Sequence, residues 1–597
     1  MPTYRAPTKD MNFIINEVLN IGKYSNLPVF SEATPDLIAA ILEEGAKICE
    51  NELAPLNHSG DQEGCTRHDD SSVTTPKGFK EAYQKFTEGG WGSLTDDPKY
   101  GGQGLPHVIG FAMEEMMVSA NMAFAMYPGL SAGARAAITI DGTDEQKQTY
   151  LPKMISGEWT GTMNLTEAHC GTDLGMLRTK AEPNDDGSYA ITGSKIFISA
   201  GEHDLADNII HLVLARLPDA PKGVKGISLF IVPKFLVNDD GSLGERNAVL
   251  CGSIEEKMGI HANSTCVLNY DGAKGFLIGE PHKGLRSMFI MMNAARLGVA
   301  VQGYGQSEVA YQNAVDYAKD RIQGRSLSGP KAPDKAADPI IVHPDVRRNL
   351  LNAKSFNEGA RAAAFWCAML VDLSHGSESE KQREWADDIV GLLTPVMKGV
   401  FTDRGFEYAA SSQQVYGGHG YIQEWGMEQF VRDARITQIY EGANGIQALD
   451  LVGRKLPANG GRAVQRFFKH VMTIVADCKT NEKLADFTGP LEKASADLQT
   501  ATMWLMQNAM QNPDNAGAAS TPYMHLFGHV LIGLQWLEMA KTSVEKLEEG
   551  SDDATFYENK LATGRYYMKR RLPETKALLA EIEAGSADVM ALDAANF

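Results

Sequence analysis

Glu441 is the residue whose setting most suggests chemistry. It stands in "QIYEGANGIQALD" (438–450), between an apolar approach and a Gly-Ala-Asn-Gly turn. A glutamate in such a position is either a solvated side chain at a helix start or a base that points into a pocket. The stretch alone leaves both interpretations open.

The cysteines and histidines do not suggest a metal site or a disulfide framework. The seven cysteines are scattered, with no CxxC pair and no Cys/His spacing suited to zinc. We therefore expect free thiols in a reducing compartment and no metal.

Charge and hydropathy exclude two further classes of protein. The formal charge of -20 would repel nucleic-acid phosphates over most of the surface, although a local basic pocket for an anionic cofactor is still allowed. No segment approaches the roughly 18 apolar residues that a membrane span needs, and the first residues lack an apolar run behind basic ones. We expect a cytoplasmic protein with neither nucleic acid nor membrane as partner.

The spacing of apolar residues along the chain predicts the helices and strands that must position Glu441. Residues 1–160 and 284–457 show helical spacing, whereas 161–283 contains short β-branched and aromatic runs separated by Gly, Asn and Asp. A Pro/Gly/Asn joint, "GRKLPANGGR", precedes a last helical segment, 458–597. The expected fold is α+β and mainly α: an N-terminal helical domain, a middle β domain, a helical bundle and a C-terminal helical extension.

Five segments together resemble the acyl-CoA dehydrogenase family in sequence, order and spacing. They are "NLTEAHCGTD" (164–173), "GSKIFISAGEHD" (193–204), "EEKMGIHANST" (255–265), "QVYGGHGY" (414–421) and "RDARITQIYEGANGIQ" (432–447). The length and the C-terminal extension are similar to those of a longer subgroup that includes an enzyme acting on 3-(methylthio)propanoyl-CoA. The family fold has the same order of domains as the one expected above.

The resemblance implies removal of a Cα proton and a Cβ hydride from an acyl-CoA, which leaves a trans-2-enoyl-CoA. Glu441 matches the family's base, and its backbone amide matches a donor to the thioester oxygen. The family's other position for the base is Ala295 here, so Glu441 is the candidate. A helix is expected to begin near Asn444, with Asn444 as a plausible cap.

The resemblance also implies FAD as the hydride acceptor and identifies candidate contacts for it. The candidates in the middle domain are Met163, Leu165, Thr166, Thr172, Phe197 and Ser199. Those in the helical bundle are Arg321, Gln323, Gln414, Gly417, Gly418, Ala443 and Gly445. The candidates for acyl-CoA binding are Thr172, Asn293, Arg296 and Gly442.

The expected partners are the acyl-CoA substrate, electron-transfer flavoprotein as electron acceptor, and further copies of the chain. Arg321 matches a family arginine that reaches the FAD of a neighbouring subunit, so a homodimer or a dimer of dimers is expected. The C-terminal extension has no cluster of candidate catalytic groups and is expected to pack on the bundle.

Several alternatives stay open on the sequence. The substrate could instead be a short or medium straight-chain acyl-CoA of β-oxidation, and an acyl-CoA oxidase would share the architecture. A non-catalytic acyl-CoA-binding scaffold would be expected to lose the base or the segment "MNLTEAHCGT" (163–172), which matches a loop that contacts the flavin and is called the flavin loop below; both are present. A nucleic-acid-binding relative is disfavoured by the acidic balance.

Overall fold

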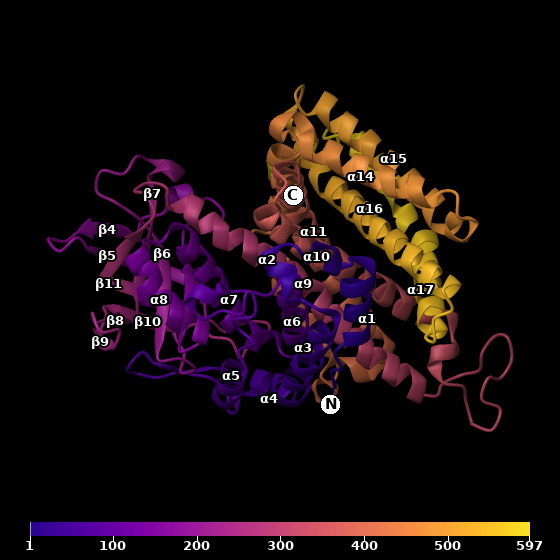
Figure 1. Cartoon of the computed structure of the whole chain (residues 1–597), viewed down its shortest axis with the longest axis horizontal. Coiled ribbons are helices and arrows are strands. Elements are labelled where there is room, and N and C mark those ends of the chain that lie inside the picture. Colours follow the sequence, from indigo (N-terminus) through magenta and orange to yellow (C-terminus); the bar gives the residue numbers. More distant parts are fainter. Residues whose placement is uncertain (1) are drawn as a thin grey trace. The chain divides into compact units, whose positions relative to one another are not determined.

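The computed structural model describes residues 2–597, which form two compact units (Figure 1). The helical unit comprises the residues up to Glu43, Pro106–Glu115 and Val299–Phe597. The mixed unit comprises Glu44–Leu105 and Met116–Gly298. Within residues 2–597, no helix combines the length and the apolar character that crossing a membrane requires.

A seven-stranded sheet forms the core of the mixed unit, in the order β10-β11-β5-β4-β6-β3. The seventh strand, β7, pairs with both β11 and β6, so the strand pairing closes on itself. The strands are β3 (Trp159–Asn164), β4 (Lys180–Pro183), β5 (Tyr189–Ser199), β6 (Asn208–Arg216), β7 (Ile227–Pro233), β10 (Val249–Ile254) and β11 (Thr265–Ile278). The runs "NIIHLVLAR" and "ISLFIVP" form β6 and β7, which are buried almost throughout and therefore apolar on both faces.

Helices pack on this sheet through bulky apolar side chains. They include α7 (Met122–Asp141) and α8 (Asp144–Ser156), whereas α5 (Phe79–Glu88) packs on α7 through Phe79 and Phe86, which contact Phe124. Trp159 at the start of β3 is buried with Met154 and with Met288 and Met291 of the first turns of α9 (Gly284–Asp320). This core fixes the loop that follows β3, which contains the predicted flavin contacts.

Two long helices, α10 (Pro344–Gly376) and α11 (Glu380–Val415), form the centre of the helical unit. Small residues allow the helix axes to approach closely. A Cβ on Gly405 of α11 would lie 2.1 Å from the carbonyl oxygen of Gly303 in α9, so only glycine fits there. The helices of this bundle therefore pack closely at these glycines.

The C-terminal extension is helical and packs on this bundle, as predicted. Its helices are α14 (Arg462–Cys478), α15 (Ala485–Asn508), α16 (Pro513–Glu548), α17 (Ala554–Arg570) and α18 (Thr575–Ala584), drawn in orange to yellow in Figure 1. Helix α16 contacts α15, α17 and α18 within the extension, and also α10, α11 and the short helix α13 (Asn444–Asp450). A Cβ on Gly528 would lie 2.7 Å from Val400 of α11, which shows how closely these two helices meet.

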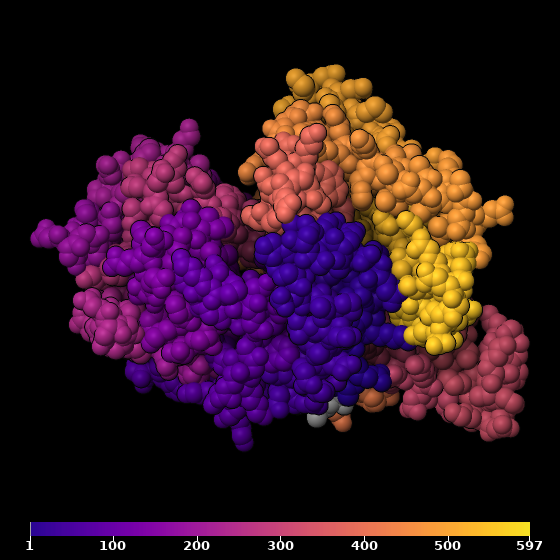
Figure 2. Space-filling model, in the orientation of Figure 1, coloured from indigo at the N-terminus to yellow at the C-terminus, as the bar shows by residue number. Residues whose placement is uncertain are grey.

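The N-terminal segment lies against α17, as the contact of indigo and yellow atoms in Figure 2 shows. The rings of Phe13 and Phe556 meet edge to face at 5.3 Å. Nearby, the buried Lys560 of α17 donates to Glu358 of α10 at 2.7 Å and pairs with Asp10. Buried charges therefore join the extension to the first and middle parts of the chain. Together, the β sheet and the helices around it confirm the predicted α+β, mainly α, fold.

Candidate active site

Glu441 lies in a tight turn between α12 (Met427–Ile436) and α13. Its φ is 55° and that of Gly442 is 89°, so two successive residues adopt left-handed backbone conformations. Glycine tolerates this conformation, whereas a glutamate there is strained. Such strain is concentrated at functional sites and persists only where surrounding contacts enforce it. Glu441 is half-buried.

Two buried side chains hold the carbonyl groups of this turn. The Lys398 ammonium donates to the Gly442 carbonyl at 2.7 Å and to the Asn444 side-chain oxygen at 2.8 Å. The Gln447 amide donates to the carbonyls of Glu441 and Gly442, both at 3.2 Å. Donors that fix the carbonyl oxygens also fix the direction of the adjacent amide groups, because peptide units are planar.

Asn444 does not act as the predicted helix cap. Helix α13 does begin at Asn444, but the capping position is Ala443, which makes no side-chain cap bond. The Asn444 amide instead lies against α11, where it donates to Thr402 at 2.8 Å and to Asp403 at 2.7 Å. The side chain is drawn away because α11 offers it stronger, charged partners.

Asp403 collects three donors on its carboxylate. Besides Asn444, Gln438 donates at 2.7 Å and the His525 ring at 2.9 Å. Burial would raise the pKa of Asp403, but the bonds from His525, Gln438 and Asn444 outweigh it and hold the pKa below its ordinary value. The carboxylate is therefore ionised at neutral pH.

Tyr440 and Glu114 complete the environment of the turn. The Tyr440 hydroxyl donates to the Gln302 side chain. Burial and the neighbouring Glu441 charge raise the pKa of Tyr440, so the phenol keeps its proton. Glu114 interacts electrostatically with Tyr440, and burial raises the pKa of Glu114 to about 7. A carboxyl group with an elevated pKa thus lies within electrostatic range of Tyr440.

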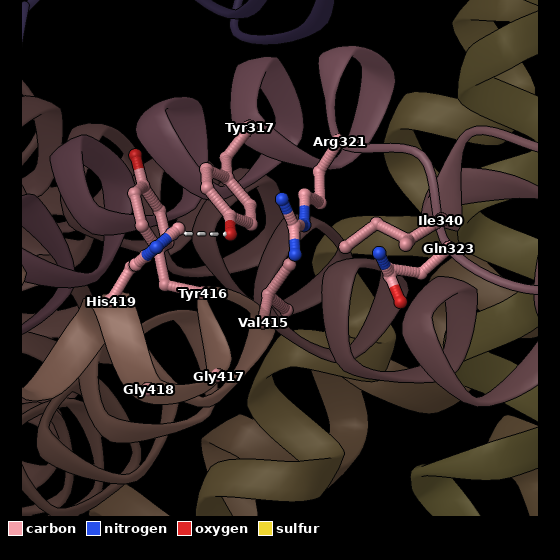
Figure 3. A pocket seen from close by; sticks show the side chains of 9 residues that line it. All are labelled: Tyr317, Arg321, Gln323, Ile340, Val415, Tyr416, Gly417, Gly418 and His419. Atoms are coloured by element: carbon pink, nitrogen blue, oxygen red, sulfur yellow. Dashed lines mark hydrogen bonds between the residues drawn. The ribbon is translucent and has the colours of Figure 1, made fainter.

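Four of the predicted FAD contacts of the helical bundle line one cavity of about 310 Å³ (Figure 3). They are Arg321, Gln323, Gly417 and Gly418. Gln414 comes directly before Val415, which also lines the cavity. Arg321 is exposed, and among residues 2–597 it has no ion-pair partner. A Cβ on Gly417 or Gly418 would meet nothing within 4 Å, so the backbone there is open to a ligand.

Three aromatic residues that are not among the predicted contacts, Tyr317, Tyr416 and His419, also line this cavity. Tyr317 stacks on Tyr416 with ring centroids 4.1 Å apart, and the Tyr317 hydroxyl lies 2.9 Å from Nδ1 of His419. His419 in turn stacks on Trp425 at 4.5 Å. The aromatic residues of "QVYGGHGYIQEW" were a signal that could have identified this wall.

The flavin loop of the mixed unit is held by a buried ion pair. Lys195 is fully buried, and its ammonium donates to Glu167 at 2.9 Å and to the Leu165 carbonyl at 3.1 Å. Glu167 also accepts from the Arg178 amide and from the Thr179 amide and hydroxyl. Burial would raise the pKa of Glu167, but Lys195 and these donors lower it to about 2. The Thr166 carbonyl accepts from the Ile196 amide, which ties the loop to β5.

Phe197 interrupts β5 at a β-bulge. The pairing with β11 shifts register between Cys266 and Leu268, and Phe197 has a φ of 59°. Its ring is 59% exposed, unusual for a large apolar side chain in a strand. Strain combined with exposure is typical of a position shaped to meet a ligand.

The remaining predicted contacts lie around these features. Met163, Leu165, Thr166 and Ser199 are half-buried, and Thr172 is exposed. On α9, Asn293 is exposed, whereas Arg296 is buried with its guanidinium over the Phe289 ring. Ala443 and Gly445 are exposed beside Glu441.

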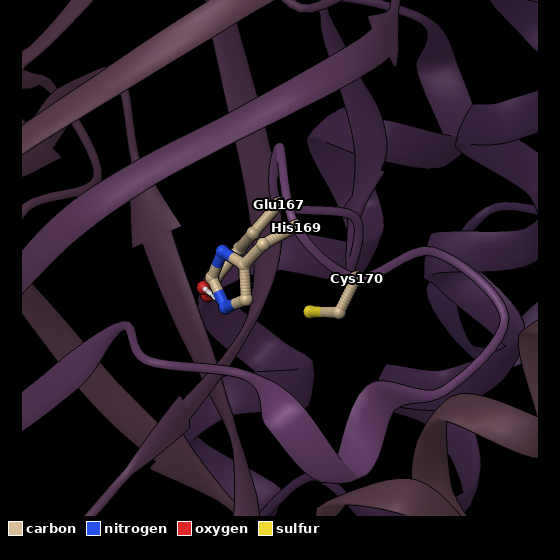
Figure 4. A group of neighbouring side chains, drawn as sticks. All are labelled: Glu167, His169 and Cys170. Atoms are coloured by element: carbon tan, nitrogen blue, oxygen red, sulfur yellow. Dashed lines mark ion pairs between the residues drawn. The ribbon is translucent and has the colours of Figure 1, made fainter.

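Glu167, His169 and Cys170 offer ligand atoms within 4.8 Å of one another (Figure 4). Their chemistry does not favour a cation. The Glu167 oxygens accept from four donors, and the Lys195 ammonium 2.9 Å away would repel a metal ion. Burial raises the pKa of the Cys170 thiol, which opposes the thiolate that a metal needs. We assign these residues to the support of the flavin loop.

Four models of protein families match successive parts of the chain. They are "Acyl-CoA dehydrogenase, N-terminal domain" (38–158), "Acyl-CoA dehydrogenase, middle domain" (162–273), "Acyl-CoA dehydrogenase, C-terminal domain" (282–456) and "Acetyl-CoA dehydrogenase C-terminal like" (467–593). Acyl-CoA dehydrogenases are FAD-dependent enzymes.

Similar proteins cover almost the whole chain. The 3-methylmercaptopropionyl-CoA dehydrogenase of Ruegeria pomeroyi is 44% identical over 96% of this chain and 97% of its own length. A butyryl-CoA dehydrogenase of Syntrophomonas wolfei is 36% identical over 99% of this chain and 98% of its own. The crystal structure of Caenorhabditis elegans ACDH-11 in complex with C11-CoA has the same fold, with a TM-score of 0.77 at 20% identity over 96% of this chain and 92% of that one. The chain therefore belongs to the acyl-CoA dehydrogenase family.

Proposed function

We propose that this protein oxidises 3-(methylthio)propanoyl-CoA to the trans-2-enoyl-CoA, with Glu441 as the base and FAD as the hydride acceptor. The observation that carries the reaction is the strained turn that presents Glu441, whose carbonyl and that of Gly442 are held by buried donors. The choice of substrate rests on the 44% identical relative, which this chain matches over nearly its full length.

Different residues of the chain have different roles in the proposed reaction. Glu441 takes the Cα proton, and its backbone amide donates to the thioester oxygen as negative charge develops there. FAD, when bound, supplies the acceptor for the Cβ hydride. Gly442 and the residues on α9, Asn293 and Arg296, are the proposed contacts of the acyl-CoA, together with Thr172.

The residues present fit each end of FAD, and in the proposed dimer the two ends belong to the FAD molecules of two subunits. At the anionic end, Arg321 is an exposed cation beside the open backbone of Gly417 and Gly418, which suits a pyrophosphate. At the ring end, the exposed Phe197 offers an apolar face next to the polar groups of Thr166 and Ser199. The other contacts in this proposal are Met163, Leu165, Thr172, Gln323, Gln414, Ala443 and Gly445.

The proposal includes partners. We propose a homodimer or a dimer of dimers in which Arg321 reaches the FAD of a neighbouring subunit, and electron-transfer flavoprotein as the electron acceptor. Arg321 is exposed at the edge of an open cavity and has no ion-pair partner within residues 2–597, which is consistent with a contact that a second subunit completes.

A panel of acyl-CoA substrates tests the proposal. We expect the purified yellow protein to be bleached fastest by 3-(methylthio)propanoyl-CoA, with a product lighter by two hydrogens in mass spectrometry. Faster bleaching by butyryl-CoA would favour the second candidate, a short-chain acyl-CoA dehydrogenase, which the 36% identical relative supports. Peroxide formation under air at the rate of turnover would instead identify an oxidase.

A further inference from the structure

The C-terminal extension reaches the turn that holds Glu441 through a chain of three polar side chains. His525 of α16 contacts Asp403 of α11 at 2.9 Å, and Asp403 accepts from Asn444 at 2.7 Å. Asn444 lies three residues after Glu441. All of these residues belong to the helical unit.

Beyond Asn444, this series of hydrogen-bonded side chains ends at a buried cation. Lys398 is fully buried and donates to the Asn444 side-chain oxygen at 2.8 Å. The Asn444 amide thus lies between an ammonium on its oxygen side and the Asp403 carboxylate on its nitrogen side. This arrangement fixes which end of the amide carries the oxygen, because an ammonium only donates and a carboxylate only accepts.

His525 contributes one specific bond to this chain. The ring is 15% exposed, and its Nε2 donates to Asp403, which as a carboxylate can only accept. The other ring nitrogen, Nδ1, is buried without a hydrogen-bond partner among residues 2–597. A histidine that leaves a buried nitrogen unsatisfied is not explained by packing alone, because an apolar side chain would fill the same space without that cost.

Lys398 links Asn444 to the backbone of the turn that contains Glu441. The same ammonium that holds Asn444 also holds the Gly442 carbonyl, at 2.7 Å. A shift of Asp403 would displace Asn444 and Lys398, and the Gly442 carbonyl would then lose its shorter donor and keep only the 3.2 Å bond from Gln447. Glu441 is in a left-handed conformation that such contacts must enforce, so its carboxylate would move with the peptide.

We infer that His525 is a positioning residue, through which the C-terminal extension holds the Glu441 turn in its reactive shape by way of Asp403 and Asn444. The inference rests on the proposed function in one respect: only that function makes this shape of the turn the reactive one. The series of hydrogen bonds from His525 through Asp403 to Asn444 is present whatever the reaction is. It gives the extension a role in the reaction beyond packing, although the extension contributes no catalytic group.

Two variants of His525 and one matched control test the inference. His525→Leu removes the bond to Asp403, whereas His525→Gln places an amide nitrogen where it can donate in place of Nε2. The control is His529→Leu, one turn further along α16. His529 is the more enclosed of the two, with 7% of its side chain exposed, and its ring contacts Tyr567 and Glu574 at 3.1 Å; among residues 2–597 it makes no hydrogen bond to Asp403.

The first measurement is the limiting rate of flavin reduction by saturating acyl-CoA without oxygen. We expect His525→Leu to lower it by about tenfold or more, since small displacements of a reacting group can cost up to about a hundredfold. Flavin content and KM should change little, and His525→Gln should recover most of the rate. His529→Leu should reduce stability to a similar extent and leave the rate near that of the wild type.

The second measurement is hydrogen exchange of peptides that cover 438–450, which needs no activity. Faster exchange there in His525→Leu, but not in His529→Leu, is expected. Unchanged exchange of this segment in His525→Leu would overturn the inference, as would equal rate losses in the two leucine variants. If the wild type is not bleached by any acyl-CoA, the proposed function fails, and hydrogen exchange still decides whether His525 holds the turn.

Discussion

The Glu441 turn and the flavin loop are both irregular segments held by buried charges, but the charges are arranged differently. In the flavin loop, Lys195 and Glu167 meet directly at 2.9 Å. In the turn, the Lys398 ammonium and the Asp403 carboxylate are joined through the neutral amide of Asn444. The loop is therefore held by an ion pair, and the turn by a relay of hydrogen bonds.

The two supports also differ in their reach along the chain. Lys195 is 28 residues from Glu167, and Thr179 is 12 residues away, so the flavin loop is held by its own β domain. The relay behind the turn extends over 41 residues from Asn444 to Asp403 and over 122 from Asp403 to His525. The ion pair of the flavin loop lies within the β domain, whereas the hydrogen bonds behind the turn extend to the C-terminal extension.

The largest expected effect separates chemistry from binding at the turn. Glu441→Gln keeps the size of the side chain but cannot accept a proton at neutral pH. We expect the rate of flavin reduction by acyl-CoA to fall by about two to four orders of magnitude, with flavin content and acyl-CoA binding retained. Stopped-flow absorbance measures the rate, and near wild-type reduction would show that another residue is the base.

Breaking the ion pair tests the flavin loop. Glu167→Gln leaves Lys195 buried without its counter-charge, which should cost about 3–5 kcal/mol of stability and release flavin. Glu182→Gln, an exposed position of β4, is the control for loss of a negative charge. Denaturant unfolding and the absorbance of bound flavin measure both effects. Full flavin retention at unchanged stability would contradict the support that we assign to this pair.

A smaller effect is expected at the cavity around Arg321. Arg321→Ala removes one charge-assisted contact and should weaken flavin affinity by about 1.5–3 kcal/mol if that contact is desolvated. Lys319→Ala removes an exposed cation two residues earlier, outside the cavity, and should have little effect. Titration of the apoprotein with FAD compares the two. Equal affinities in both variants would remove Arg321 from the cofactor site.

The smallest effect concerns Glu114, whose carboxyl group lies near the turn. Because burial raises its pKa to about 7, the folded state favours the protonated form. The associated stability is fully present below the pKa of the unfolded chain, about 4.3, and is lost as the pH rises through about 7. Glu114→Gln stays neutral and should raise the melting temperature by about 1–2 °C at about pH 8.5 but not at about pH 5. A pH-independent difference would mean that Glu114 is ionised in the folded protein.

Local sequence was sufficient for the fold class and for the family. The change of period around residues 161–283 predicted the β domain, because strands and helices repeat their apolar residues at different intervals. The motif Tyr440-Glu441-Gly442 identified the candidate base, since its neighbours in sequence are also its neighbours in the turn. Gly417 and Gly418 were likewise found from a short motif, and they do line a cavity with Arg321.

The tertiary structure alone decided what holds these motifs in place. Nothing within "QIYEGANGIQALD" indicates that Glu441 has a positive φ, or that Asn444 turns from its expected capping role toward Asp403. His525 and Tyr317 belong to no motif, and their roles follow from partners about a hundred residues away in sequence. Periodicity and short motifs indicate which face of an element is buried. A hydrogen bond between helices that are distant in sequence depends instead on how those helices pack, and packing is a property of the whole chain.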